Sequence, residues 1–403
     1  MITPANALQL VLNETEVLPP TYYQLNKAIG LCLETEIKAD RPYPAFNKSL
    51  RDGFAVYVRN AGHTIPIIGE CAPGKKPELL NSDSALSIYT GAPCPDGCEA
   101  VVKIEDCTIN PDHTVSLPAI IIPGQNIEKS SSIIIDNQIL IEKGSVLTPQ
   151  TAAVAASCGI TQLKSIRRPV IAVIITGDEI VKYGKTPSQW EIRDSNSVLI
   201  TSTLEMMGIK DVSVHYCRDN PRDYDTLLDS IEADVVIISG AVSMGKYDIV
   251  PKILENAGVR KIFHRITQKP GRPMYFGKLN KTLFFGLPGN PAAVKMCTDR
   301  YICPAIQKMM GLPVHTSNIK AILESPISVS GNRTSFLSGI LSFDNKVLFK
   351  PLLDKGSADI FSTINSNSYC VLEGGDYELD AGSEVSVYVP PYIPMSSVFA
   401  KPE

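Results

Sequence analysis

The sequence lacks a strong excess of charge, long apolar runs and a recognisable signal segment. Its 38 Lys and Arg residues against 42 Asp and Glu give a formal net charge of -4. This balance provides no overall basic footprint for DNA or RNA, which argues against a nucleic-acid partner. No uninterrupted apolar run approaches the ~20 residues of a membrane helix, and residues 1–14 lack a basic stretch followed by an apolar core. We therefore expect a cytoplasmic protein with no membrane partner.

Paired metal-binding spacings are also missing. The ten cysteines are scattered along the chain, and only Cys94, Cys98 and Cys107 come near one another in sequence. The five histidines lie far apart, whereas a structural zinc site usually takes four Cys or His ligands in paired short spacings. Neither a disulfide framework nor a zinc site follows, and we expect reduced, partly buried thiols.

The length of 403 residues exceeds what one hydrophobic core usually organises, and 44% hydrophobic residues is typical of a globular protein. The pattern changes along the chain, which indicates several domains. Helical spacing at 5–12 and 23–33 gives way to short β-like runs between Gly, Pro and Asn turns over 45–127. A further helix is expected over 148–159, with a threonine cap at its start and a glycine at its end.

The most regular region alternates apolar runs with amphipathic helical patterns, which is typical of βαβ units and a parallel sheet. Its apolar runs are 169–175, 211–215, 234–239 and 282–286. Beyond about 315, short alternating runs predict a separate β domain. The predicted fold class is therefore multi-domain α/β and β: a discontinuous helical N-terminal domain (1–44 plus 128–165), an inserted β-rich domain (45–127), a central parallel-sheet α/β domain (166–314) and a C-terminal β-barrel-like domain (315–403).

Polar turns follow three of these apolar runs, where an open parallel sheet usually binds its ligands. The first run leads into the tight turn 176–179, which sets Asp178 and Glu179 side by side. Another run leads into the glycine-rich loop 240–248, whose small residues let backbone N–H groups approach an anion at a helix start. A solvated turn in the first case, and a tight connection capped by Asp248 in the second, remain alternatives.

Two further segments could bind anions. In the turn 286–293, Asn290 can cap a helix whose first residue is proline, which would leave N–H groups free at the helix start. A plain connector is the commoner reason for any single turn. The segment 269–273 sets Lys269 and Arg272 around a proline-stiffened bend, as a site for an oxyanion or pyrophosphate requires. The alternative is a solvated basic loop.

The trio Asp194-Ser195-Asn196 precedes a helical run that Gly208 ends, so we interpret it as a cap rather than as catalytic. Anion-binding turns and paired carboxylates at one sheet edge together indicate a phosphorylated substrate with a divalent metal. The carboxylates would hold Mg²⁺, and the turns would hold phosphate.

Motifs over nearly the whole chain carry a family resemblance: residues 167–179, 239–245 with Asp248, 269–273, 286–291, 49–55 and 90–95. These segments resemble the MoeA family, the molybdenum-insertion family of molybdenum cofactor synthesis, which is similar to the E domain of gephyrin. The motifs of the α/β region alone are shared with the MogA and CinA families. The two upstream segments make MoeA the specific match.

The resemblance implies a homodimer, with a MogA-like molybdopterin-binding domain at 166–314. Its active site lies between the third and fourth domains of one protomer and the second domain of the other. The implied reaction converts molybdate and adenylylated molybdopterin (molybdopterin-AMP) into molybdenum cofactor and AMP, with Mg²⁺. A MogA-like adenylyltransferase and a molybdoenzyme or chaperone are the implied partners.

By matching position, Glu179 and Asp248 are the candidates for metal binding and catalysis, with Asp178 beside them. The candidate substrate-binding residues are Asp52, Thr90, Asp194, Ser195, Asp219, Ser239, Gly240, Ser243, Gly245, Lys269, Pro270, Gly271, Arg272, Pro288, Gly289, Asn290 and Ser357.

Several positions depart from the family pattern. The replaced residues are Asn47 and Asn220 for Asp, Arg51 for Met, Ala241 for Gly, Ser130–Ser132 for Gly-Glu-Asp and Ser338 for Arg. A change from Asp to Asn removes base and metal-ligand capacity, and loss of the Arg weakens oxyanion binding. The alternatives are therefore an active insertase, a catalytically impaired paralogue that carries molybdopterin, and a dimeric scaffold. Retention of Glu179, Asp248 and Lys269 favours the insertase.

Overall fold

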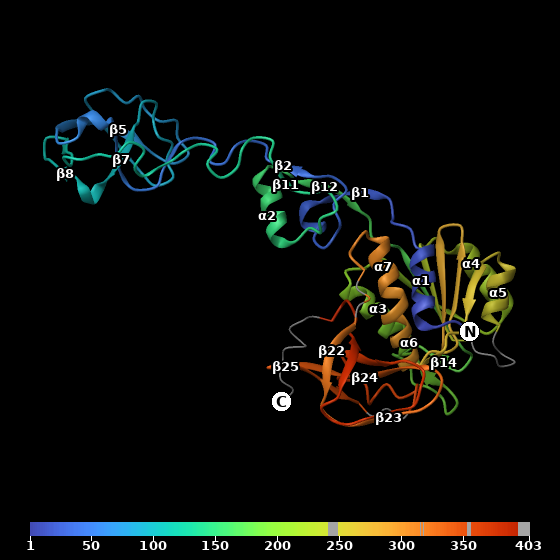
Figure 1. Cartoon of the computed structure of the whole chain (residues 1–403). Coiled ribbons are helices and arrows are strands. Elements are labelled where there is room, and N and C mark those ends of the chain that lie inside the picture. The colour runs from blue at the N-terminus through green and yellow to red at the C-terminus, as the bar shows by residue number, and fades with distance from the viewer. Residues whose placement is uncertain (241–248, 315, 317, 353–355, 394–403) are drawn as a thin grey trace. The chain divides into compact units, whose positions relative to one another are not determined.

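The computed structural model describes residues 1–240, 249–314, 316, 318–352 and 356–393, and it divides into two compact units (Figure 1). The smaller unit comprises Tyr23–Ile29 and Leu33–Leu163; the larger comprises Met1–Tyr22, Gly30–Cys32 and Lys164–Glu403. None of the helices in the described residues is long and apolar enough to cross a lipid bilayer. The four-domain boundaries from the sequence are finer than this division and stay predictions.

A six-stranded sheet in the order β7-β4-β6-β5-β9-β8 forms the β-rich part of the smaller unit. β5 and β6 are parallel, and the other neighbouring strands are antiparallel. β4 is buried on both faces, because Phe54 and Val56 pack into one apolar cluster and Ala55 into another. The elements are β4 (Gly53–Val56), η2 (Val58–Asn60), β5 (Thr64–Cys71), β6 (Ala85–Ile88), β7 (Ala100–Lys103), η3 (Ile104–Asp106), β8 (Thr108–Ile109) and β9 (Thr114–Ser116).

Helix α2 (Pro149–Ser157) lies where the sequence predicts a helix. The Thr148 hydroxyl accepts a hydrogen bond from the Thr151 N–H at 3.2 Å, and Gly159 follows the helix with a φ of 75°. Short two-stranded pairs, β2 with β11 and β3 with β10, complete this part of the unit. Their bounds are β2 (Ile37–Lys38), β3 (Lys48–Ser49), β10 (Ile127–Glu128) and β11 (Ile139–Ile141).

The helix expected over 23–33 is wrong. A strand, β1 (Pro20–Gln24), and one 3₁₀ turn, η1 (Leu25–Lys27), occupy the start of this segment. The Leu25 N–H donates to the Thr161 carbonyl at 2.9 Å, so the backbone bonds to a distant segment here and only a single 3₁₀ turn follows. Tertiary pairing thus overrides the local helical spacing.

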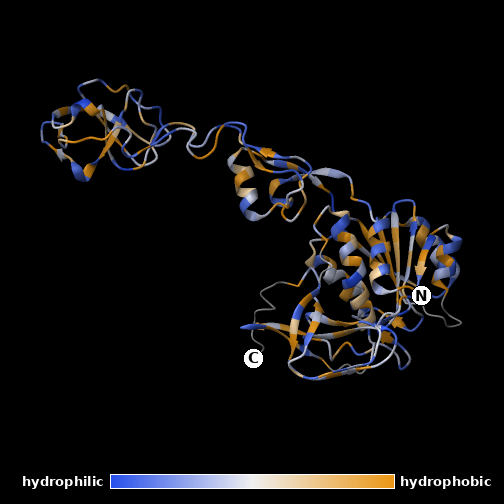
Figure 2. Ribbon diagram, viewed as in Figure 1, coloured by the Kyte–Doolittle hydropathy of each residue, from blue (hydrophilic) through white to orange (hydrophobic). Residues whose placement is uncertain are grey.

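The centre of the larger unit is a six-stranded sheet in the order β16-β13-β17-β21-β20-β18. Its first four strands are parallel, as the apolar runs predict, and β20 and β18 add an antiparallel edge. Figure 2 shows apolar residues concentrated along these strands. The strands of this sheet are β13 (Ile171–Thr176), β16 (Val212–Cys217), β17 (Val235–Ser239), β18 (Arg260–His264), β20 (Tyr275–Leu279) and β21 (Thr282–Leu287). Outside the sheet lie β12 (Gln162–Ile166), which pairs with β1, and the parallel pair β14 (Ile180–Val181) and β15 (Ile192–Arg193).

Helices cover this sheet. α4 and α5 bury Tyr224, Val250 and Leu254 against β13 and β17, while α3 contacts β13 and α6. α1 packs on α7, where the Lys308 ammonium donates to the Leu12 carbonyl at 2.6 Å. The bounds are α1 (Pro4–Glu14), α3 (Asn196–Met206), α4 (Pro221–Ser230), α5 (Val250–Asn256) and a continuous helical stretch of α6 (Pro291–Cys297), the π-helical turn η4 (Thr298–Ile302) and α7 (Cys303–Met309).

The C-terminal strands close on themselves as a small barrel, because each of β24, β25, β22, β28 and β26 pairs with the next and β26 pairs again with β24. β19 (Gln268–Lys269), which belongs to the preceding region of the chain, adds to β24 in parallel. This pairing sets the cationic segment 269–273 beside the barrel. The bounds are β22 (Asn318–Leu323), β23 (Ile327–Val329), β24 (Thr334–Asp344), β25 (Lys346–Pro351), β26 (Ser368–Leu372), β27 (Tyr377–Leu379) and β28 (Glu384–Tyr388).

Candidate active site

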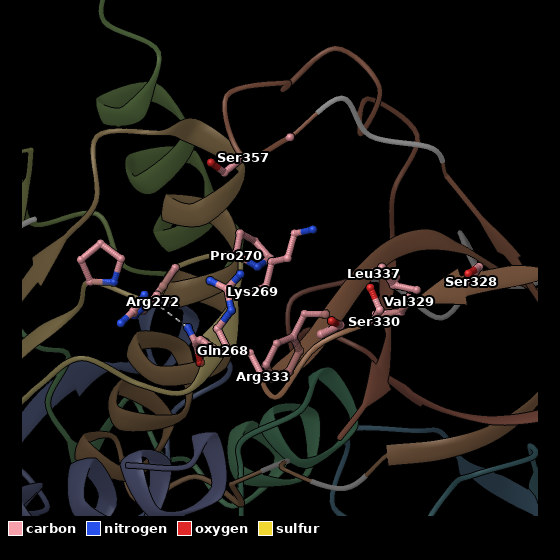
Figure 3. Close-up of a pocket in the computed structure, with 15 residues that line it drawn as sticks. Gln268, Lys269, Pro270, Arg272, Ser328, Val329, Ser330, Arg333, Leu337 and Ser357 are labelled. Atoms are coloured by element: carbon pink, nitrogen blue, oxygen red, sulfur yellow. Dashed lines mark hydrogen bonds between the residues drawn. The ribbon is translucent and has the colours of Figure 1, made fainter. Parts of the chain in front are cut away.

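Two neighbouring cavities of opposite charge lie in the larger unit. The acidic cavity, of about 970 Å³, is lined by the loops that follow β13 and β17 and by the start of α6. The basic cavity, of about 560 Å³, lies between residues 268–273 and the barrel (Figure 3). The ionisable residues of the acidic cavity are Asp178, Glu179, Arg193, Asp194 and Asp219. Those of the basic cavity, among the described residues, are Lys269, Arg272 and Arg333.

The turn after β13 brings two carboxylates to the acidic cavity. Gly177 adopts a φ of 136°, and the Thr176 hydroxyl donates to Asp219 Oδ1 at 2.5 Å. Asp178 and Glu179 are both exposed, and within the described part of the chain no hydrogen bond or ion pair engages either carboxylate. They are therefore available to a ligand, whereas one oxygen of Asp219 is committed to the turn.

The Asn196 side chain connects three segments around the acidic cavity by hydrogen bonds. Its amide Nδ2 donates to Ser239 Oγ at 2.9 Å, at the end of β17, and to the Gly289 carbonyl at 2.7 Å, just before α6. The sequence analysis treated Asn196 only as part of a helix cap. The signal for its role is a long-range contact, which no local spacing records.

Asp194 lines the acidic cavity, but its carboxylate is already engaged. It accepts hydrogen bonds from the Ser197 N–H at 3.0 Å, from the Ser197 hydroxyl and from the Tyr216 hydroxyl at 2.8 Å. Ser195 stands at the N-cap of α3 without a side-chain capping bond. The predicted capping role of the trio thus falls to Asp194, which holds the first turn of α3 in place.

Gly240 sits where the backbone passes very close to the turn after β13. Its φ is 113°, and a Cβ atom would lie 2.5 Å from the Thr176 carbonyl oxygen. Of the other residues predicted in this loop, Ser243, Gly245 and Asp248 lie outside the described residues. α5 begins at Val250, after an N-cap, Ile249, that makes no side-chain hydrogen bond.

Asn290 links the two cavities. Asn290 is the N-cap residue of α6 and Pro291 is its first residue, as predicted, but the Asn290 side chain makes no capping hydrogen bond. Its Nδ2 instead donates to Ser357 Oγ at 2.7 Å, and the Ala292 N–H donates to the Ser357 carbonyl at 3.2 Å. Asn290 and Gly289 line the acidic cavity and Ser357 lines the basic one; Pro288 follows β21 but is absent from the described lining of both.

The basic cavity unites the predicted segment 269–272 with Ser357 and adds a residue that the sequence analysis missed. Arg333 lies at the start of β24, and it is exposed like Lys269 and Arg272. Ser338, where the family pattern has Arg, is 9% exposed and outside the described lining. Arg333 was not recognisable from the sequence, because the β19–β24 register that brings it there spans more than 60 residues.

Asp52 and Thr90, also predicted to bind substrate, lie together in the smaller unit. The Thr90 N–H and hydroxyl donate to Asp52 Oδ1 at 2.7 and 2.8 Å. These two hydrogen bonds, the backbone one first, hold the pKa of Asp52 below its ordinary value because they favour the ionised form.

Two of the replaced positions keep a structural role. Asn47 Oδ1 accepts a hydrogen bond from the N–H of Ser130, another replaced position, at 2.9 Å. Asn220 caps α4 by accepting from the Arg222 N–H at 3.2 Å. An amide oxygen performs both tasks as well as a carboxylate does, so the loss of charge leaves the local fold intact.

Comparison with known proteins places this geometry in a family. The chain matches the MoeA N-terminal region (domain I and II) over 2–159, a probable molybdopterin binding domain over 172–308 and the MoeA C-terminal region (domain IV) over 320–389. It is 30% identical over 378 residues to a molybdopterin molybdenumtransferase of Haemophilus influenzae, which covers 91% of this chain and 93% of that protein. The chain belongs to the MoeA family.

Further relatives agree with this assignment. A molybdopterin molybdenumtransferase of Synechocystis is 28% identical over 397 residues, with 95% of this chain and 98% of that protein covered. A solved structure of a molybdopterin biosynthesis MoeA protein from Pyrococcus horikoshii is 25% identical, with a TM-score of 0.81 over 96% of this chain and 99% of that one. The family and the multi-domain α/β and β fold class predicted from the sequence are confirmed.

Proposed function

We propose that this MoeA-family chain is a molybdopterin molybdenumtransferase, which converts molybdate and molybdopterin-AMP into molybdenum cofactor and AMP. The observation that carries the proposal is the pairing of a basic and an acidic cavity across the Asn290–Ser357 hydrogen bond of 2.7 Å. The reaction joins an oxyanion to a phosphorylated substrate, so it needs two anion sites of different character next to each other.

The basic cavity suits molybdate. Lys269 and Arg272 lie on one side of the basic cavity and Arg333, which immediately precedes β24, also lines it. Three cations thus line a space whose described lining contains no carboxylate. Guanidinium groups offer paired N–H donors to the oxygens of a tetrahedral dianion. The Ser357 hydroxyl accepts from Asn290 and can turn its own proton towards a bound oxygen.

The acidic cavity suits a phosphate with a divalent cation. Asp178 and Glu179 alone would repel a phosphate, whereas Mg²⁺ typically binds through one or two carboxylates together with substrate phosphates. The donor set therefore fits Mg²⁺, with Glu179 and Asp178 as the described residues that would hold it; Asp248, also proposed for this role, lies outside them. When bound, the metal would neutralise charge on the phosphate as AMP leaves.

We also propose that the chain acts as a homodimer and meets a MogA-like adenylyltransferase and a molybdoenzyme or chaperone. The support is the family membership together with the match to its N-terminal region over residues 2–159. A sedimentation measurement should then give a mass near twice 43.8 kDa. A monomer at every concentration would contradict the proposed homodimer but would not affect the assignment of the two cavities.

The assignment of the cavities is tested by two variants and two ligands. Arg333→Ala should weaken molybdate binding about tenfold or more and leave Mg²⁺-dependent AMP binding unchanged, while Glu179→Ala should do the reverse. Lys320→Ala is the matched control, because it removes a positive charge from the exposed β22 of the same barrel, where Lys320 pairs with Glu384 at 3.0 Å. Isothermal titration calorimetry measures both affinities.

Equal effects of Arg333→Ala on both ligands, or an equal loss with Lys320→Ala, would show that net charge rather than the basic cavity governs molybdate binding. Molybdate binding that survives Lys269→Ala and Arg333→Ala together would contradict the location of the oxyanion site.

A further inference from the structure

The cationic segment of the basic cavity rests on a buried hydrogen-bond network. Gln268 is 0% exposed, and its Nε2 donates to the Gly271 carbonyl at 3.1 Å (Figure 3). Its Oε1 accepts from the hydroxyl of Tyr301 at 2.5 Å, and Tyr301 is likewise fully buried. Tyr301 belongs to η4, the π-helical turn, so the network joins the cationic segment to the helical stretch beneath it.

The segment has little room to adopt another shape. Gly271 has a φ of 81°, and a Cβ atom there would lie 2.6 Å from Cys297 Sγ and 3.0 Å from Gln268 Nε2. The Ile266 N–H donates to the Arg272 carbonyl at 3.0 Å and closes the bend. The backbone between Lys269 and Arg272 thus packs directly against the side chains of Gln268 and Cys297.

The groups of this network are neutral, and each hydrogen bond has a defined donor and acceptor. Burial raises the pKa of Tyr301 well above its ordinary value, so its hydroxyl stays protonated and can donate. Burial also raises the pKa of the Cys297 thiol, whose Sγ lies 3.9 Å from the Gly271 carbonyl. Because Tyr301 donates to Oε1 of Gln268, the amide must direct its Nε2 towards the Gly271 carbonyl; a flipped amide would set two oxygens against each other.

We propose that Gln268 and Tyr301 are positioning residues that hold Lys269 and Arg272 in the arrangement that binds the oxyanion substrate. This inference rests on the proposed function, because it concerns the same basic cavity. Neither residue's polar atoms need touch molybdate. They act through the Gly271 carbonyl, whose position sets where the flanking side chains leave the backbone.

Tyr301→Phe tests the inference with little change in shape, because it removes one oxygen from the buried network. We expect the KM for molybdate to rise on the order of tenfold, as it does for outer-shell partners of other ligand sites, while kcat at saturating molybdate stays within about twofold. Gln268→Met should give the same split, since it removes the hydrogen bonds of the Gln268 amide to Gly271, Tyr301 and Cys297 and nearly keeps the volume. The readout is AMP release from molybdopterin-AMP at varied molybdate.

Tyr388→Phe is the matched control. Tyr388 is also buried, and its hydroxyl donates at 2.7 Å to the carbonyl of Asp299 in the same π-helical turn, so this hydrogen bond involves none of residues 268–273. It should lower the unfolding temperature about as much as Tyr301→Phe and leave the KM for molybdate unchanged. The two variants therefore separate a role in positioning from a general role in stability.

A tenfold rise in KM confined to Tyr301→Phe and Gln268→Met would support the positioning role. Equal KM values for Tyr301→Phe, Tyr388→Phe and the unaltered chain would overturn it. If Lys269→Ala raises the KM steeply while Tyr301→Phe does not, only this inference fails; if Lys269→Ala also has no effect, the proposed oxyanion site itself is wrong.

Discussion

Asp299 is the buried charge on which the contact between the helical stretch and the barrel depends. It is 0% exposed, and it accepts from the Lys295 ammonium at 2.8 Å, the Tyr369 hydroxyl at 2.6 Å and the Tyr392 hydroxyl at 2.7 Å. Tyr369 is on β26 of the barrel, whereas Asp299 is on η4. Asp299→Asn removes the charge and nearly keeps the shape, so it isolates the electrostatic part of this contact.

The expected loss of stability in Asp299→Asn follows from the charged group that is left without a partner. Tyr369 and Tyr392 donate to different oxygens of Asp299, so with asparagine one phenol can still donate to the amide oxygen and the other must turn to accept from the amide N–H. The Lys295 ammonium, only 19% exposed, loses its counter-ion. Removing one partner of a buried ion pair costs about 3–5 kcal/mol, and we expect the lower end because Lys295 keeps some contact with water. At roughly 2–4 °C per kcal/mol for a unit of this size, the unfolding temperature should fall by about 6–12 °C.

The assay is thermal unfolding followed by circular dichroism, with the variants Asp299→Asn, Lys295→Met and the two combined. Removing both charges should cost less than Asp299→Asn alone, because a buried pair replaced as a whole is often nearly neutral. A loss below about 1 kcal/mol for Asp299→Asn, or a double variant that loses the sum of both single effects, would refute the reasoning.

Three more predictions follow from single contacts. Burial raises the pKa of Tyr388 well above its ordinary value near 10. The stability that this group contributes is therefore present below pH ~10 and is lost as the pH rises above it. Absorbance near 295 nm should show the Tyr388 phenol ionising only when the protein unfolds in alkali. Thr90→Val should raise the pKa of Asp52 towards its ordinary value, because it removes the hydrogen bond from the Thr90 hydroxyl. A lowered pKa stabilises the fold at pH values above the ordinary pKa, so the variant should lose stability in acid less steeply than the unaltered chain. NMR titration measures the pKa and urea unfolding the stability, and an unchanged pKa would contradict the assigned hydrogen bond. Gly240→Ala should lower the free energy of unfolding in urea by about 1–3 kcal/mol, since its Cβ would lie 2.5 Å from a carbonyl oxygen. In the control Gly289→Ala the new Cβ meets nothing closer than 4.0 Å, so its effect should be nearly neutral. Equal losses in the two variants would show that the close approach is not the cause.

Much of the central sheet could be predicted because three of its parallel strands, β13, β17 and β21, are buried almost throughout. The apolar runs at 169–175, 234–239 and 282–286 correspond to β13, β17 and β21 within one or two residues. The antiparallel edge was not predicted: β18 (Arg260–His264) is largely polar and half exposed, and β20 contains Gly277. Edge strands lack the continuous apolar pattern that marks central ones.

The candidate site divides in the same way between local and long-range features. Turns such as 176–179 and 269–273 are specified by local chemistry, and the structure places them at the two cavities. The direction of the Asn290 side chain was predicted wrongly, because helix-capping rules consider only the residues that follow. Arg333 and Asn196 were missed, since contacts across the sheet and the barrel bring them to the cavities.

The most direct test of the account is AMP release from molybdopterin-AMP by the purified chain, with molybdate and Mg²⁺. We predict molybdate-dependent release that Glu179→Ala abolishes and that Glu205→Ala, which removes an exposed carboxylate on α3, leaves unchanged. Tight binding of molybdopterin-AMP with no release by the unaltered chain would contradict the insertase and favour a carrier of molybdopterin, whereas equal release by Glu179→Ala would contradict the role assigned to Glu179.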